Sequence, residues 1–192
     1  MHSVWTGAPS CDQKTAATLF GNPPFVGMAN MDTDQQVDRN AVFASLAVAG
    51  KRTGRLDYVA AWYGKAMAYL RGQTIRAAFV STNSIVQGDQ ARALGPLLLA
   101  AGIRIDFAHR TFEWASEAHG KAHVHVVIVG FSAAATAPAP RTLRLYDYPE
   151  LRGEPVEHTA TNINIYLVDG PNIIPSNETH RCVPGCAPLI RK

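Results

Sequence analysis

The sequence predicts an α/β fold in which helices cover a parallel β-sheet. Strand-like and helix-like segments follow one another in the order strand, two helices, strand, helix, strand, and this alternation is typical of a parallel sheet. Polar residues gather directly after two of the strands, at the end of the sheet where such folds bind ligands. The chain has 192 residues, of which 47% are hydrophobic. A chain of this length can bury one core of ordinary size.

The first strand is predicted at residues 17–20 ("ATLF"), because a short apolar run ends there at Gly21. We expect a helix after it that begins at Asp32 or Thr33, since both residue types cap helix N-termini. A second helix is expected over residues 56–70, where apolar residues recur at helical spacing. These two helices would connect the first strand to the second.

The second strand is predicted at residues 75–82 ("IRAAFVST"), an apolar run that ends in polar residues. A helix follows over residues 88–101, and we expect Pro96 to kink or interrupt it, because proline lacks the N–H that a helix uses. Residues 103–108 and 123–131 have the apolar character of two more strands. The first three of these four strands alternate with the helices, which is the pattern of a parallel sheet.

The chain is expected to divide into three parts. Residues 1–16 are polar and lack periodicity, whereas residues 17–131 carry the α/β layer. Residues 132–192 open with small residues and prolines that are typical of a linker. A short strand is predicted at residues 142–148, and the remaining tail is expected to be extended and weakly packed.

Asn22, Pro23, Pro24 and Phe25 directly follow the first predicted strand. Each proline fixes its own φ, lacks an N–H and biases the preceding residue toward an extended backbone. These four residues therefore predict a rigid, extended loop and exclude helix or inner strand. An Asn-Pro pair also begins ordinary turns, but a chance match to all four residues in a chain of this length is about one in a thousand.

This loop suits an exocyclic amine on a planar ring. The carboxamide oxygen of Asn22 and the carbonyl oxygen of Pro23 can each accept one N–H of such an amine, and Phe25 can stack on the ring. The two acceptors favour a pyramidal nitrogen whose lone pair is available to attack. The prolines hold the acceptors in place, so preorganisation and not a general base would supply the rate.

Several blocks of the sequence resemble, in order, one family of enzymes. The blocks, within residues 19–170, include "GNPPFVG", "LDYVAAWYGKA", "AFVSTNSIVQGDQ", "IDFAHRTFEWASEAHGKAHVHVVIVGF" and "YDYPELRGEP". They are similar to amino-group DNA methyltransferases that modify adenine at N6, in the MmeI-like branch of bacterial restriction-modification enzymes. The resemblance implies a partial Rossmann-like fold, S-adenosylmethionine as methyl donor, and double-stranded DNA from which the target adenine is flipped out.

The resemblance also assigns residues of this chain to the target base. They are Asn22, Pro23, Pro24, Phe25, Ser81, Thr82, Asn83, Phe112 and Trp114. The first four form the catalytic loop, in which the asparagine and the first proline bind the amine and the phenylalanine stacks on the base. The next three lie beside the pocket at the end of a strand, and the last two belong to an aromatic loop that holds the flipped base.

In that family the cofactor is held by a glycine-containing turn and an acidic ribose-binding residue, both upstream of the Asn-Pro-Pro-Phe loop. Only 21 residues precede Asn22 here, and no G-x-G pattern occurs in the chain. We therefore expect residues 17–131 to be the C-terminal half of a catalytic domain, followed by the start of a target-recognition region. No cofactor-binding residue is assigned, and the chain by itself is expected to have no measurable methyltransferase activity.

Two hypotheses about function remain open on the sequence. In the first, the chain belongs to a site-specific adenine-N6 DNA methyltransferase. In the second, it is a non-catalytic remnant, or a subunit that gives a DNA base-binding pocket to a partner with the cofactor half. Binding of S-adenosylmethionine to the chain would separate them.

Other features of the sequence favour ordinary structure over a second site. His123 and His125 share one face of a strand, but no carboxylate or cysteine completes a ligand set, so no metal is predicted. Cys182 and Cys186 are interpreted as unpaired thiols in the tail. The formal charge is +3, and neither a long apolar segment nor a signal-like N-terminus is present. We expect a cytoplasmic protein without a membrane segment.

Overall fold

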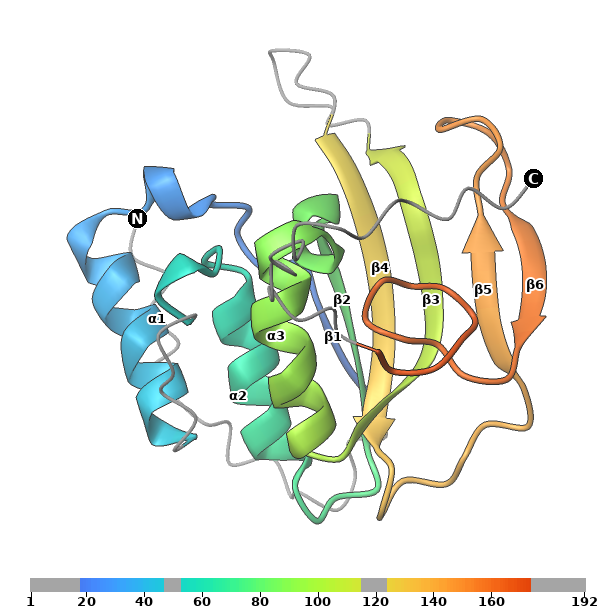
Figure 1. Ribbon diagram of the computed structural model, residues 1–192, viewed down its shortest axis with the longest axis horizontal. Helices are drawn as coiled ribbons and strands as arrows, with labels where there is room; N and C mark the ends of the chain where they lie inside the picture. Colours follow the sequence, from blue (N-terminus) through green and yellow to red (C-terminus); the bar gives the residue numbers. More distant parts are fainter. Residues whose placement is uncertain (1–17, 47–52, 115–123, 174–192) are drawn as a thin grey trace, which may run out of the picture.

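The computed structural model describes residues 18–46, 53–114 and 124–173. These residues form one six-stranded sheet, and three α-helices lie together on one of its faces (Figure 1). The expected α/β architecture is therefore confirmed. Residues 1–16, with His123, Cys182 and Cys186, lie outside the described residues.

The elements have the following bounds. The strands are β1 (Thr18–Gly21), β2 (Arg76–Thr82), β3 (Ile103–Trp114), β4 (Val124–Ala133), β5 (Leu143–Asp147) and β6 (Val156–Ala160). The α-helices are α1 (Thr33–Ser45), α2 (Ala60–Leu70) and α3 (Gly88–Ala100). Short 3₁₀ helices are η1 (Met28–Asn30), η2 (Thr53–Arg55) and η3 (Asn83–Val86). In the described ranges, no helix has the length and apolar character that crossing a bilayer requires.

Local sequence explains where the helices begin and continue. Asp32 caps α1, since its carboxylate accepts the N–H of Gln35 while the Gln35 side chain accepts the N–H of Asp32. The predicted interruption of α3 is wrong, because Pro96 lies within a helix assigned continuously from Gly88 to Ala100. Gly95 precedes this proline and has no Cβ, which relieves the clash that normally disfavours helix before proline.

The sheet is mixed and not parallel. Its strand order is β1-β2-β4-β3-β5-β6; β1, β2, β3 and β5 run in one direction, and β4 and β6 are antiparallel to their neighbours. The three strands of the predicted pattern, β1, β2 and β3, do share one direction, but the sheet is not wholly parallel, because β4 lies antiparallel between β2 and β3. Nine residues, 115–123, connect β3 to β4. A parallel connection needs a dozen or more.

An aromatic cluster anchors α2 to the sheet. The Tyr63 ring of α2 lies 5.3 Å from Phe79 of β2 and 5.4 Å from Phe131 of β4, measured between ring centroids. All three side chains are buried. The Tyr63 hydroxyl lies 3.0 Å from the Ser81 hydroxyl, and complete burial raises the pKa of Tyr63 above its usual range. The helix-facing side of β2 is therefore part of the core.

Residues 161–170 form a packed loop on the helix side of the sheet (Figure 1). Ile163 and Leu167 belong to the core cluster and are 3% and 1% exposed. Asn164 accepts the N–H groups of two later residues in the loop, and Asp169 accepts two N–H groups near its start. The prediction of a weakly packed tail was wrong for this segment, because these side chains close a loop that has no periodic pattern.

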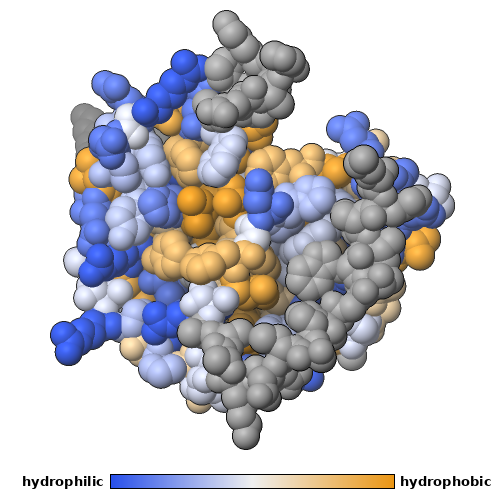
Figure 2. Space-filling model, turned by 180° about the vertical axis from the view of Figure 1, so that it is seen from behind, coloured by the Kyte–Doolittle hydropathy of each residue, from blue (hydrophilic) through white to orange (hydrophobic). Residues whose placement is uncertain are grey.

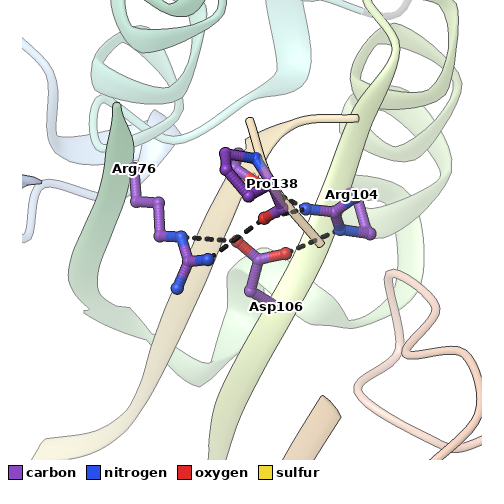
Figure 3. A network of polar contacts seen from close by, with 5 residues as sticks. Arg76, Arg104, Asp106 and Pro138 are labelled. Carbon is purple, nitrogen blue, oxygen red and sulfur yellow. Dashed lines mark hydrogen bonds and ion pairs between the residues drawn. The ribbon is translucent and has the colours of Figure 1, made fainter. Parts of the chain in front are cut away.

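A polar network around a buried carboxylate joins β2, β3 and the Pro138 segment at the amino ends of β2 and β3. Asp106 of β3 is 4% exposed, and Figure 3 shows Arg76 of β2 and Arg104 of β3 approaching it from two sides. Arg104 Nε donates to Asp106 at 2.7 Å, and Arg76 Nε lies 3.9 Å from its other oxygen. Both arginines also donate to the Pro138 carbonyl. This network stabilises the amino ends of β2 and β3, away from their carboxyl ends.

The face of the sheet turned away from the helices carries an apolar patch. Side chains alternate along β2, so Phe79 faces α2 whereas Val80 faces the other way. Val80 and its partner Ile128 on β4 are half-buried, and Phe20 of β1 is 76% exposed. Figure 2, seen from behind, shows apolar residues gathered near the centre of the molecule. No helix of the described residues covers this face.

Candidate functional site at the carboxyl edge of the sheet

The carboxyl ends of β1, β2, β3 and β5 lie at one edge of the sheet, because these strands share a direction. The Asn-Pro-Pro-Phe loop follows β1 there, Ser81 and Thr82 end β2, and Phe112 and Trp114 end β3. Thr82 pairs with Val126 of β4, which in turn pairs with Phe112. Thr82 and Phe112 therefore lie in one row on the same face of the sheet, about 10 Å apart.

In the Asn-Pro-Pro-Phe loop the second residue is packed against the protein, whereas the first is exposed to solvent. Pro23 is buried, Asn22 and Pro24 are exposed, and Phe25 is half-buried and lies outside the core cluster. In the described part of the chain, no residue makes a hydrogen bond with the Asn22 side chain. The carboxamide is therefore available to a ligand, while the backbone beside it is packed.

Two consecutive residues before α2 hold the segment that follows the loop. The N–H of Tyr58 donates to the Val26 carbonyl at 2.9 Å, and the N–H of Met28 donates to Asp57 Oδ1 at 2.8 Å. Sequence reasoning missed Asp57, although it lies in the block "LDYVAAW". The available signal was an acidic residue directly before an apolar helical pattern, which alone does not reveal a partner 29 residues away.

The residues predicted beside the pocket at the end of β2 separate to two faces. Ser81 is fully buried, and its hydroxyl bonds with Tyr63 in the helical layer. Thr82 points the other way and is half-buried, and its hydroxyl lies 2.9 Å from that of Ser84. Asn83 is half-buried at the start of η3. Ser81 therefore supports the core, and Thr82 and Asn83 remain candidates for the pocket.

An aromatic cluster occupies the carboxyl ends of β3 and β5. Phe112 and Trp114 lie within β3 itself and not in a loop as expected, because β3 extends to Trp114. Tyr148 stacks on Phe112 at 4.7 Å, and Tyr146 stacks on His109 at 4.3 Å. One face of the Phe112 ring is therefore covered by Tyr148. Trp114, 39% exposed and 6.2 Å from Phe112, extends the cluster toward the edge.

His109 joins this cluster as a neutral ring. Its Nδ1 lies 2.8 Å from the Tyr148 hydroxyl. Burial lowers the pKa of His109 and raises the pKa of Tyr148, which favours the neutral form of both groups. The tautomer of His109 decides which of the two donates the hydrogen bond.

Acidification is expected to destabilise the protein through His109. Because its pKa is lower in the folded state, the unfolded chain binds the proton more readily, and stability falls as the pH drops below the ordinary value of about 6.5. Urea unfolding at about pH 7.5 and 5.5 should show a smaller loss of stability for His109→Gln than for the wild type. The exposed His125→Gln serves as control. Equal losses for the His109 variant and the wild type would contradict this role.

Most of the arginines that could contact phosphate are paired within the protein. Arg104 pairs with Asp106, Arg110 bonds Asp147 at 2.8 Å, and Arg144 lies 3.4 Å from Glu157. Arg152 donates two bonds to Glu113, at 2.8 and 2.7 Å. Each of these four arginines therefore has an acidic partner within the protein.

The described residues do not form a cofactor site of the dinucleotide-binding type. Among them, β1 is followed by the Asn-Pro-Pro-Phe loop, β2 by η3 and β6 by the loop of residues 161–170, and none of these is a glycine-rich turn. They also bring together no group of three or more histidine, cysteine, aspartate or glutamate side chains that could hold a metal ion.

This sheet, with the Asn-Pro-Pro-Phe loop at the carboxyl ends of its strands, has the architecture of a partial Rossmann-like fold of the methyltransferase type. Residues 3–146 match the sequence model of the family described as MmeI, DNA-methyltransferase domain. The chain belongs to this family, and a methyltransferase family points to S-adenosylmethionine as the methyl donor.

Two relatives support this assignment. The chain is 34% identical over 175 residues to "DNA methyltransferase A" of Bacillus subtilis (strain 168), covering 91% of this chain and 18% of the relative. It is 45% identical to the Type IIL restriction-modification enzyme MmeI, solved in complex with DNA, with a TM-score of 0.77 over 85% of this chain and 21% of that one. The chain thus spans about a fifth of the length of each relative.

Proposed function

We propose that this chain supplies the target-base pocket of a site-specific DNA methyltransferase that transfers a methyl group from S-adenosylmethionine to N6 of adenine. The observation that carries the proposal is the Asn-Pro-Pro-Phe loop, with Asn22 exposed, Pro23 buried and the following backbone held by Asp57 and Tyr58. Membership of the MmeI family supports the methyl-transfer reaction. The solved relative is a complex with DNA, which supports DNA as the substrate.

In this proposal the chain's own residues bind and orient the amine. The Asn22 carboxamide oxygen and the Pro23 carbonyl accept the two N6 protons, which draws the nitrogen lone pair out of conjugation with the ring. Phe25 stacks on the adenine, and Thr82 and Asn83 border it from the end of β2. S-adenosylmethionine, when bound, would supply the methyl group: its carbon–sulfur bond would break as the bond to N6 forms, the sulfur would keep the electron pair, and the methylated amine would lose one proton to solvent.

The flipped base must regain part of the stacking that it loses. Taking a base out of the duplex costs a few kcal/mol, and contact with aromatic rings offsets part of that cost. Phe25 would provide one ring, and the cluster of Phe112 and Trp114 would provide others at the same edge of the sheet. Because Tyr148 covers one face of Phe112, the base would contact its edge or its other face.

A second candidate function is a subunit that gives this base pocket to a partner carrying the cofactor half. The apolar sheet face opposite the helices favours it, since Phe20 is 76% exposed there and Val80 and Ile128 are only half-buried. A face of this composition suits burial against a further layer of the domain. Calorimetry of the purified chain with S-adenosylmethionine tests this second candidate, because heat of binding would show that the chain has its own cofactor site and needs no partner to supply one.

The proposed reaction is tested by the product. DNA is incubated with S-adenosylmethionine and an active enzyme that contains this chain, and its nucleosides are analysed by mass spectrometry. We expect N6-methyldeoxyadenosine with the wild type and none above background with Asn22→Ala. Methylated cytosine in place of methylated adenine would overturn the assignment of the target base.

A further inference from the structure

Three hydrogen bonds from different parts of the chain meet at Asp57. Its Oδ1 accepts the N–H of Met28 at 2.8 Å, and its Oδ2 accepts the Ser84 hydroxyl at 2.9 Å. Its own N–H donates to the side-chain oxygen of Gln90 in α3 at 2.9 Å. The carboxylate therefore connects the segment after β1 to η3, which follows β2.

The position of Asp57 is itself fixed by two helices. Gln90 Nε2 donates to the Arg55 carbonyl at 2.9 Å, so one side chain of α3 makes hydrogen bonds to the backbone on both sides of Leu56. Arg39 of α1 is 4% exposed and donates to the Leu56 carbonyl at 2.9 Å. Burial lowers the pKa of Arg39, and the charge of Asp57 acts in the opposite direction. The backbone that carries Asp57 is therefore fixed by α1 and α3.

Thr82, Ser84 and Asp57 form a chain of two hydrogen bonds, here called the hydroxyl chain, in which the donor of each bond can be assigned. The Ser84 hydroxyl donates its one proton to the carboxylate, which can only accept. The hydroxyls of Thr82 and Ser84 lie 2.9 Å apart, so Thr82 must be the donor of that pair. The Thr82 hydroxyl proton is then engaged in the bond to Ser84, so toward a base in the proposed pocket the Thr82 oxygen can act only as a hydrogen-bond acceptor. An acceptor there matches an N–H of the target base and repels a ring nitrogen or a carbonyl oxygen.

We propose that Asp57 is a positioning residue with two effects. It fixes the position of the Asn-Pro-Pro-Phe loop relative to η3, and it makes the Thr82 hydroxyl a hydrogen-bond acceptor. The inference rests on the proposed function, because the loop and Thr82 are assigned there to the target adenine. Asp57 does not touch the base. It acts through Met28 on the loop and through Ser84 on Thr82.

Three variants separate the two effects. Asp57→Ala removes both the loop contact and the end of the hydroxyl chain. Asp57→Asn keeps an oxygen for the Met28 N–H but offers an amide that donates to Ser84, so the direction of the chain reverses and Thr82 can donate into the pocket. Ser84→Ala removes the chain and leaves the loop contact. Asp34→Asn, an exposed residue of α1, is the control for charge.

The loop contact is tested by amide hydrogen exchange of Met28 in the full chain. Asp57→Ala should speed exchange at this amide by about tenfold or more, since a bond to a charged acceptor is lost. Asp57→Asn, Ser84→Ala and Asp34→Asn should leave exchange within about threefold of the wild type. Unchanged exchange in Asp57→Ala overturns the loop effect, and this readout requires no methyl transfer.

The hydroxyl effect is tested by steady-state methylation with the enzyme that contains this chain. Asp57→Asn and Asp57→Ala should each lower kcat by about tenfold, with the KM for DNA within about twofold, because the misplaced groups act on the bound base. Wild-type kcat in Asp57→Asn overturns the hydroxyl effect. Absence of adenine methylation by the wild type itself would refute the proposed function, whereas the exchange result would stand.

Discussion

Asn22→Ala is expected to lower kcat for adenine methylation by about 10²- to 10³-fold, with DNA affinity within about twofold of the wild type. The carboxamide oxygen accepts a proton of the amine most strongly when the nitrogen becomes pyramidal in the transition state. Its removal therefore acts on the chemical step more than on binding. The expected magnitude is taken by analogy from the fall in kcat that follows deletion of one oriented hydrogen-bond donor in an oxyanion hole.

The structure predicts that this loss does not arise from unfolding. Asn22 is exposed, and within the described residues its side chain has no hydrogen-bond partner. The loop is held by burial of Pro23 and by the contacts of Val26 and Met28, which the substitution leaves intact. The thermal stability of Asn22→Ala should therefore equal that of the wild type.

Single-turnover methylation and DNA binding, measured on the same preparations, check this prediction. Asn30→Ala is the matched control, because Asn30 is an exposed asparagine at the end of η1, close to the loop in sequence. It should retain wild-type kcat. If Asn22→Ala keeps kcat within about twofold, the amine is not held by this residue and the role assigned to the loop is wrong.

Local patterns in the sequence were sufficient for most elements of the fold. The apolar run at residues 75–82 became β2, and the capping residue Asp32 begins α1 as expected. Strand direction was predicted less well, because it depends on how strands are connected. The predicted strands left 14 residues, 109–122, between β3 and β4, which is enough for a parallel crossover. Because β3 extends to Trp114 in the structure, only nine remain.

The candidate site shows a similar division. The Asn-Pro-Pro-Phe loop is contiguous, so its residue types were sufficient to predict its place after β1. The separation of Ser81 from Thr82 also had a sequence signal, because alternation places Ser81 on the same side as Phe79. Asp57 had none that was specific, since its partners Met28 and Ser84 lie 29 and 27 residues away. Only the fold brings these three together.

Phe25→Ala is expected to weaken binding of the flipped base by about 1 to 3 kcal/mol, the range found for loss of one aromatic stacking partner. Phe25 is half-buried and lies outside the core cluster, and it follows the buried Pro23 and the exposed Pro24. These two prolines restrict the backbone that leads to Phe25. The ring is therefore placed to contact a ligand at the carboxyl edge of the sheet. Its loss should have little effect on folding.

Phe43→Ala is the matched control, because the Phe43 side chain of α1 is only 1% exposed. A buried change of this kind costs about 3 to 5 kcal/mol, which in a domain of this size lowers the melting temperature by about ten degrees or more. Phe25→Ala should instead melt within a few degrees of the wild type. In DNA with 2-aminopurine at the target position, the variant should quench the flipped base less than the wild type does. If Phe25→Ala melts as low as Phe43→Ala, its ring is part of the core and the stacking role is refuted.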